Sequence, residues 1–266
     1  MLASYKNKWL FVHIPKTGGS TISDAMWEYA DLQGASVYEV NDTSVPLKNC
    51  KIDRKYFQHD TAQVIKRKFK LDGHDYNSFY KFAVVRNPWD LVVSTWAYWH
   101  KLVAEGDSFP YAKWVCETFK TFEDYVNKNI SSGTMNQCDY IYNGNRCQIE
   151  STINYTENYN GDKLFDTIAT KARLHDNSKD VSTKNINKKP IILINKVAKL
   201  ENLEKDFTEI FDKIGNINPK SYDKLKKKVN ASSHKHYTEY YNKATRKKIA
   251  ESFARDIKHF GYEFGD

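Results

Sequence analysis

The sequence predicts an α/β fold with a mainly parallel central sheet flanked by helices. Three apolar runs of strand type support this prediction, because each is followed by a helical pattern: Trp9–Ile14, Phe79–Val85 and 190–194. The run Phe79–Val85 has few polar interruptions, which is typical of a parallel strand buried on both faces. Ligands bind outside the carboxyl ends of the strands in such sheets, so the residues that follow these runs are the first candidates for a site.

The composition permits an anionic ligand without identifying it. The chain has 266 residues, enough for one sizeable domain with a buried core, and a net charge of +8. Most of the 41 basic residues are lysines, scattered along a chain that is also rich in Asn, Ile and Tyr. Base composition alone can produce that bias, and no nucleic-acid-binding motif is present, so no nucleic-acid partner is predicted.

Membrane segments and metal sites are not indicated. No run approaches transmembrane length, and Trp9–Ile14 is too short for the apolar region of a signal peptide. We therefore expect a soluble, cytoplasmic protein. The four cysteines have neither a C-x-x-C spacing nor a histidine at zinc-ligand spacing, so we expect no metal and no disulfide framework.

The first candidate site is the turn that follows Trp9–Ile14. Backbone N–H groups of such a turn, and of the first turn of the helix after it, point at one spot where the helix dipole adds partial positive charge. Adjacent glycines let an anion approach the backbone closely. The anion-binding candidates are the lysine, the glycines and the hydroxyl residues of this turn: Lys16, Thr17, Gly18, Gly19, Ser20 and Thr21.

The second candidate site follows Phe79–Val85 and reads Arg-Asn-Pro-Trp-Asp. Pro88 suits the first turn of a helix, where its missing N–H costs nothing. The predicted buried stripe of that helix leaves Ser94 off its centre. A guanidinium can fork two hydrogen bonds onto a phosphate, and a hydroxyl near the helix start can add a third. Taken alone, Arg86 could equally form a salt bridge at the strand end.

The third candidate is His59, after a possible short strand at Lys55–His59. Asp60 and Gln63 have the spacing of an N-cap and its capping-box partner, so a helix is predicted to begin there. The dipole at the start of a helix disfavours the imidazolium ion and keeps the ring neutral. A neutral histidine, with a normal pKa of about 6.5, is an economical general base. The alternative is a histidine that merely caps this helix.

The first two sites together resemble the nucleotide-binding segments of sulfotransferases that use 3′-phosphoadenosine 5′-phosphosulfate (PAPS). Pro-Lys-Thr-Gly-Gly-Ser after a strand is similar to the 5′-phosphosulfate loop of that family. Val-Arg-Asn-Pro-Trp-Asp, with a serine eight residues after the arginine, is similar to its 3′-phosphate-binding segment. The resemblance implies that Arg86 and Ser94 bind the 3′-phosphate. It is nearest to the heparan and chondroitin sulfate enzymes, some of which carry a histidine base in a segment comparable to that of His59.

Two later segments resemble the family more weakly. Lys199–Leu203 is similar to its Arg-Phe-Glu-Asn-Leu segment, with lysine in place of arginine, so Glu201 is given only a structural role. Residues 230–237 are similar to a loop that closes over the nucleotide, although a solvated loop explains them equally well. The additional nucleotide-binding candidates in this loop are Ser233, Lys235 and Tyr237.

The resemblance implies a P-loop-like sulfotransferase fold in one domain over residues 1–266, with a loop-rich acceptor-side insertion at about 100–190. The expected reaction is sulfuryl transfer from PAPS to a hydroxyl of an acceptor, which we expect to be a carbohydrate, with His59 and Lys16 as catalytic residues. A P-loop nucleotide kinase is an alternative, but it would need glycines before the lysine and an acid that holds magnesium. A nucleotide-binding module without catalysis is the other alternative.

Overall fold

The computed structural model describes residues 1–36, 39, 51–107, 109–131, 133–143, 191–215, 217–226 and 234–266. Within these ranges a six-stranded sheet has the order β4-β3-β1-β2-β5-β8. Strand β1 runs antiparallel to its neighbours β2 and β3, whereas the other neighbouring pairs are parallel. The predicted α/β fold with a mainly parallel sheet is therefore confirmed. The strands are β1 (Leu2–Ser4), β2 (Trp9–Val12), β3 (Leu32–Ala35), β4 (Ile52–Phe57), β5 (Tyr80–Val85) and β8 (Lys196–Lys199).

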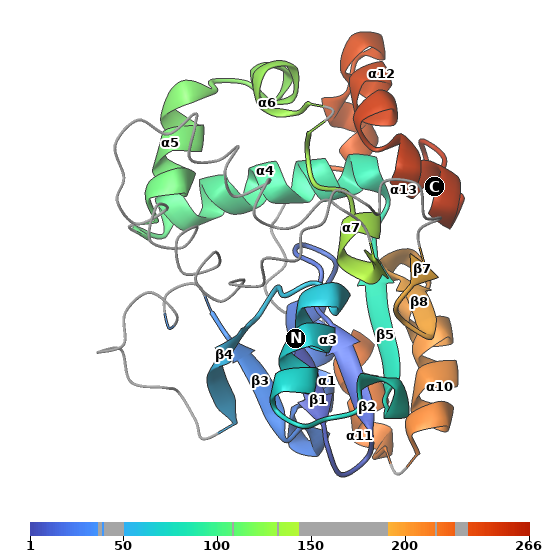
Figure 1. Ribbon diagram of the computed structural model, residues 1–266. Helices are drawn as coiled ribbons and strands as arrows, with labels where there is room; N and C mark the ends of the chain where they lie inside the picture. Colours follow the sequence, from blue (N-terminus) through green and yellow to red (C-terminus); the bar gives the residue numbers. More distant parts are fainter. Residues whose placement is uncertain are drawn as a thin grey trace, which may run out of the picture.

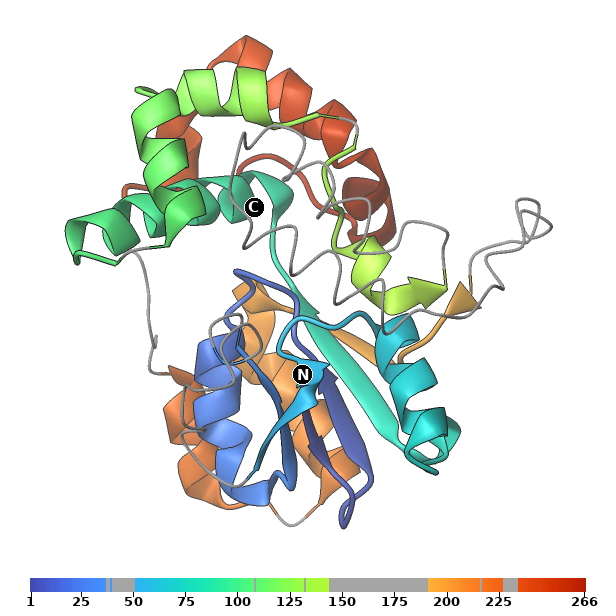
Figure 2. The same cartoon turned by 60° about the vertical axis from the view of Figure 1, so that its left-hand side comes forward.

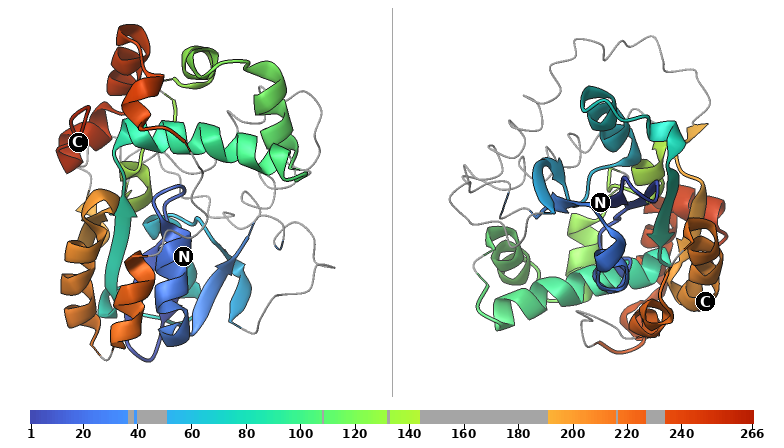
Figure 3. Two further views of the ribbon diagram at one scale, coloured as in Figure 1. Left: turned by 180° about the vertical axis from the view of Figure 1, so that it is seen from behind. Right: turned by 90° about the horizontal axis from the view of Figure 1, so that it is seen from below.

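Helices cover both faces of the sheet (Figures 1 and 3). One face carries α3 (Ala62–Leu71) and the short α7 (Cys138–Ile141), and the other carries α1 (Gly19–Met26), α10 (Leu203–Ile214) and α11 (Pro219–Lys226). Strand β2 shows why helices must pack on both faces of the sheet. Its side chains alternate, with Leu10 and Val12 in the core beneath α3 and with Trp9 and Phe11 in the core beneath α1 and α10. All four are buried, as the apolar run predicted.

A third group of helices lies across the carboxyl ends of the strands (Figure 2). Helix α4 (Pro88–Ala104) follows β5 directly, and α5 (Pro110–Thr118), α6 (Phe122–Asn129), α12 (Lys243–Ser252) and α13 (Ala254–Phe260) lie around it. These helices share their own apolar core, which includes Trp89, Val93, Val115, Val126 and Ile249. The residues that connect β5 to α4 therefore lie where the sheet meets this helical layer.

The prediction that residues 190–194 form a strand of the central sheet is wrong. Ile191–Ile192 forms β7, which pairs antiparallel with β6 (Tyr142–Asn143) in a separate two-stranded sheet. Both isoleucines are exposed, by 60% and 47%. The central sheet instead gains Lys196–Lys199 at its edge, where a strand has a neighbour on one side only and a continuous apolar run is not required. The sequence Tyr-Asn-Gly-Asn at 142–145 favours a hairpin turn, but it lies partly outside the described residues, as does the predicted insertion beyond residue 143.

Two helix boundaries also differ from the prediction. Thr61, not Asp60, caps α3, and its side chain accepts a hydrogen bond from the Val64 N–H at 3.3 Å. The Asp60 carboxylate instead accepts from the Phe57 N–H at 2.8 Å and closes the turn after β4. The apolar residues between Ile249 and Ile257 predict one helix that ends at Gly261, but the segment is divided at Phe253 into α12 and α13.

Candidate active site

The turn after β2 is built around two glycines that no larger residue could replace. Gly18 caps α1 with φ of 81°, in the left-handed region. A Cβ on Gly18 would lie 2.6 Å from Leu200 Cδ1, and a Cβ on Gly19 would lie 1.8 Å from His13 Nε2. The buried Thr17 hydroxyl donates to the Ile14 carbonyl at 2.9 Å, so its proton holds the turn.

The backbone of this turn offers donors to an anion. The N–H groups of Thr21 and Ile22 bond to the Gly18 carbonyl at 3.0 and 3.2 Å. Within the described part of the chain, the N–H groups of Gly18, Gly19 and Ser20 have no acceptor. They lie at the positive end of the α1 dipole, an arrangement that binds phosphate and sulfate groups.

Lys16 is held in this turn with φ of 64°, a left-handed backbone conformation that is uncommon for a lysine. Its Nζ lies 3.8 Å from the centroid of the Tyr98 ring on α4. Burial, followed by the charges of Arg86 and Lys101, lowers the pKa of Lys16 to about 8. The ammonium group is therefore charged at neutral pH but poorly solvated, so an anion beside it would stabilise it.

Arg86 joins the second motif to the first. Its Nη1 donates to the Lys16 carbonyl at 3.2 Å, and its Nε donates to Asp90 Oδ2 at 2.7 Å. Arg86 therefore forms a salt bridge at the strand end, which was the alternative role considered from the sequence. These two bonds use only two of the five N–H donors of a guanidinium. The remaining N–H donors suit the oxygens of a phosphate. The Arg86 side chain is only 13% exposed, and this burial strengthens a charged hydrogen bond to a phosphate.

Ser94 lies on the face of α4 that meets both motifs. It follows Asp90 by four residues and precedes Tyr98 by four, and residues at this spacing share one face of a helix. Asp90 holds Arg86 and Tyr98 contacts Lys16, so the same face reaches both turns. Ser94 is buried, in contrast to the predicted position off the buried stripe, and its hydroxyl makes no hydrogen bond among the described residues.

His59 follows β4 by two residues and is oriented by the backbone of the first motif. Its Nδ1 donates to the His13 carbonyl at 2.9 Å, so in the neutral ring the lone pair is on Nε2. Burial lowers the pKa of His59 to about 4, and the positive charge of Lys16 contributes to the shift. Because Thr61 caps α3, His59 is not the helix cap that the alternative interpretation proposed.

The structure thus brings the three strand-end residues together, since Arg86 bonds to the Lys16 backbone and the charge of Lys16 acts on His59. A model of the sulfotransferase family matches residues 1–263 of the chain. The chain belongs to the sulfotransferase family. Neither the curated proteins nor the solved structures gave a match. Membership makes the protein a transferase that moves a sulfuryl group to a hydroxyl-bearing acceptor.

Of the other nucleotide-binding candidates, Tyr237 contacts the second motif through Asn87, whereas no described contact links Lys235 to either motif. Ser233 lies outside the described residues. Lys235 is exposed and pairs with Glu239 at 3.7 Å. Tyr237 is buried, and its hydroxyl accepts hydrogen bonds from the Gly265 N–H at 2.7 Å and from Asn87 Nδ2 at 3.3 Å. Their role in the sulfotransferase stays a prediction.

Sequence reasoning missed residues that support the site from a distance. The Gln137 side chain accepts from the Arg86 N–H and donates to the Arg86 carbonyl, both at 2.8 Å, and so extends β5 like a further peptide group. Buried Asp256 of α13 accepts from the Gln137 and Cys138 N–H groups at 2.7 and 2.9 Å. No local pattern marks these residues. Glu201 has the structural role that was predicted, since it accepts from the Asn87 N–H at 2.6 Å.

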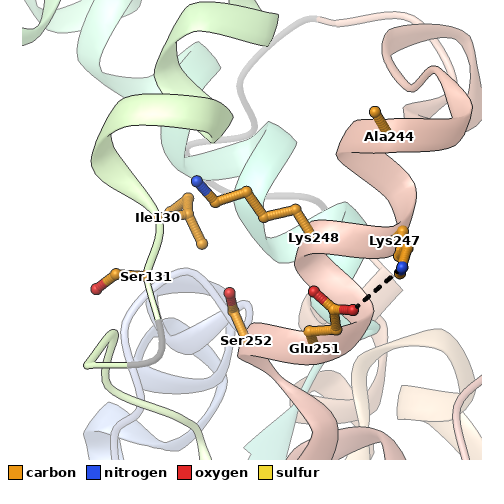
Figure 4. Close-up of a pocket in the computed structure, with 7 residues that line it drawn as sticks. All are labelled: Ile130, Ser131, Ala244, Lys247, Lys248, Glu251 and Ser252. Carbon is orange, nitrogen blue, oxygen red and sulfur yellow. Dashed lines mark ion pairs between the residues drawn. The ribbon is translucent and has the colours of Figure 1, made fainter.

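Elsewhere, a hollow of about 460 Å³ lies between the end of α6 and α12 (Figure 4). It is lined by Ile130, Ser131 and residues of α12, with a Lys247–Glu251 ion pair at 3.7 Å. It contains none of the candidate residues. Within the described ranges, no group of three or more His, Cys, Asp or Glu could hold a metal ion, and no helix combines the length and apolar character needed to cross a membrane.

Proposed function

We propose that this sulfotransferase takes its sulfuryl group from PAPS and transfers it to a carbohydrate hydroxyl. The observation that carries the proposal is the hydrogen bond of 3.2 Å between Arg86 Nη1 and the Lys16 carbonyl. This bond joins the two motifs for which we propose anion binding, one built from backbone N–H groups and one from a guanidinium. A nucleotide with anionic groups at both its 3′ and 5′ positions fits such a pair.

In this proposal the two motifs divide the donor between them. Arg86 and Ser94 bind the 3′-phosphate, with the guanidinium as the charged donor and the buried hydroxyl as the neutral one. Lys16 and the N–H groups of Gly18, Gly19 and Ser20 bind the 5′-phosphosulfate. The unpaired N–H groups and the Ser94 hydroxyl, which makes no hydrogen bond among the described residues, support this assignment because these donors remain available to a ligand.

PAPS supplies an activated sulfuryl group, and the residues of the chain supply proton transfer and charge stabilisation. His59 Nε2 accepts the proton of the acceptor hydroxyl, since its Nδ1 already donates to the His13 carbonyl. Lys16 stabilises the negative charge that develops on the oxygen between phosphorus and sulfur. The low pKa of His59 keeps the base neutral at physiological pH.

A carbohydrate acceptor is supported by the resemblance to the heparan and chondroitin sulfate enzymes and by the histidine base. We also propose that residues 1–266 form one domain in the cytoplasm, with acceptor contacts in the region of about 100–190. The described part of that region is helical, in α5 to α7. A kinase is disfavoured because Lys16 precedes its glycines, which is the reverse of a P-loop.

Calorimetry and a transfer assay test the proposal together. The wild-type protein should bind 3′-phosphoadenosine 5′-phosphate (PAP) far more tightly than AMP, and equal affinities would contradict the assignment of Arg86 and Ser94. Radiolabelled PAPS, offered with a panel of glycans, lipids and phenols, should label a glycan. Labelling of phenols alone would retain the donor and reject the acceptor class.

The role of His59 separates an enzyme from a nucleotide-binding module. His59→Ala should lower kcat by roughly 10² or more, while PAP affinity stays near that of the wild type. His74→Ala, at a histidine that packs against Tyr5 and Phe69 instead, is the matched control. Normal turnover in His59→Ala would move the base elsewhere.

A further inference from the structure

A second histidine lies beside the proposed base and has no part in the function above. His13 follows β2 and is only 6% exposed. Its ring stacks on Phe11 with centroids 5.4 Å apart and stands edge-on to the His59 ring at 4.5 Å. The side chain is therefore fixed between the base and the turn that contains Lys16.

One hydrogen bond sets where the His13 ring carries its proton. Gln58 Nε2 lies 3.4 Å from His13 Nδ1. An amide nitrogen only donates, so Nδ1 is the acceptor and Nε2 carries the hydrogen. Burial, with smaller contributions from the neighbouring charges, holds the pKa of His13 well below its usual value, so the ring stays neutral. Nε2 is consequently a neutral hydrogen-bond donor.

The position of His13 Nε2 connects this donor to the anion-binding turn. A Cβ on Gly19 would lie 1.8 Å from it, so Nε2 packs directly against the Gly19 backbone at the start of α1. Within the described residues no hydrogen bond to Nε2 is found, and Nε2 is not among the completely buried atoms without a partner, so it is accessible to a ligand in the turn.

We propose that His13 is a further catalytic residue, whose Nε2–H donates a hydrogen bond to an oxygen of the transferred sulfuryl group. This inference rests on the proposed function, since it needs PAPS in the turn at Lys16. The sulfuryl group must lie between the acceptor hydroxyl held by His59 and the phosphate held by the turn. His13 lies between the same two elements, and it adds a neutral donor where Lys16 adds a charged one.

A purely structural role would make a different prediction. If the ring only separates the His59 segment from the turn, its shape matters and its N–H does not, so His13→Phe would behave like the wild type. If the N–H matters, His13→Gln should be the better substitute, because its amide nitrogen can take the place of Nε2. His13→Phe keeps the volume of the ring and loses the donor.

The test compares PAPS with PAP by calorimetry, because the two differ only in the sulfuryl group. We expect His13→Phe to bind PAP within about twofold of the wild type and PAPS roughly 5- to 10-fold more weakly, which is the loss of one hydrogen bond. His13→Gln should keep most of the PAPS affinity. Turnover with PAPS should fall in His13→Phe and recover in His13→Gln. Thermal unfolding of each variant shows whether it is folded.

Several results would overturn the inference. Equal loss of PAP and PAPS affinity in His13→Phe would indicate a structural role, and unchanged affinity for both would exclude the contact. The wild-type protein gives a measurement that needs no variant, since nitrogen-15 NMR of the histidine rings should find the proton of His13 on Nε2, and a proton on Nδ1 would contradict the inference. Failure of the proposed function looks different, because the wild type would then bind neither nucleotide.

Discussion

The two motifs of this sulfotransferase for which anion binding is proposed are built in different ways. The turn at Lys16 relies on backbone N–H groups, which only a glycine-rich chain path can present. The Arg86 motif relies on side chains, namely a guanidinium oriented by Asp90 and a hydroxyl on the same face of α4. A backbone site is sensitive to any added atom, whereas a side-chain site is lost only when its own groups are removed. The following substitutions test this difference.

The largest effect is expected from one added methyl group in the turn. Gly19→Ala places a carbon 1.8 Å from His13 Nε2, so the turn or the ring must move. We expect kcat to fall by roughly 10² or more and the free energy of unfolding to decrease by about 1 to 3 kcal/mol. Enzyme assays and chemical denaturation measure the two quantities. The double variant His13→Ala/Gly19→Ala should regain the lost stability, and a failure to regain it would refute the steric cause.

Lys16→Ala removes the charge from the turn and leaves its backbone in place. Charge on the departing oxygen grows between the bound substrate and the transition state, so kcat should fall by roughly 10²- to 10³-fold while PAP affinity changes much less. Because no metal is proposed to share this task, EDTA should leave wild-type turnover intact. The exposed Lys226→Ala is a suitable control. A larger loss of affinity than of kcat would make Lys16 a binding residue.

Arg86→Ala should affect binding and not the chemical step. Loss of a largely buried charged donor should weaken PAP binding by about 2 to 4 kcal/mol, and AMP binding should hardly change, because AMP has no 3′-phosphate. Arg86→Lys keeps the charge but loses the two parallel hydrogen bonds of a guanidinium, so it should recover only part of the PAP affinity. Calorimetry with both nucleotides measures the preference. An equal loss for PAP and AMP would assign Arg86 to the fold.

The smallest effect near neutral pH is expected from titration of the site. Burial lowers the pKa of His59 to about 4 and that of Lys16 to about 8. Above its pKa the base is neutral, and below its pKa the lysine is charged, so kcat/KM should be level between these two values. It should fall as the pH drops below about 4 and as it rises above about 8, since kcat/KM reports the free enzyme. An acid limb near 6.5, with the protein folded, would show an unperturbed base.

The parts of the site that the sequence predicted are those with local causes. Gly18, Gly19 and Pro88 restrict the backbone where a strand becomes a helix, and the strand-end positions of Lys16 and Arg86 follow from them. His59 could be placed because β4 and α3 flank it, although its segment is a turn closed by Asp60.

The parts that were missed depend on contacts between distant residues. Gln137 pairs with Arg86 across 51 positions of the sequence, and its own environment depends on Asp256 in α13. Strand β8 was misplaced because an edge strand needs few apolar residues, while the more apolar Ile191–Ile192 pairs outside the central sheet. Tyr98 had a usable signal, since it follows Ser94 by one helical turn, on the face that meets Lys16.

Helix α4 also fixes the spacing between its contacts with the two motifs. Asp90, which holds Arg86, and Tyr98, which contacts Lys16, are eight residues apart on one rigid helix. At about 1.5 Å per residue their separation along the axis is roughly 12 Å. Because the same helix touches both anion-binding motifs, neither can shift along it without breaking its contact. In the proposed function, one helix therefore holds both motifs in a fixed arrangement for a donor that carries two anionic groups.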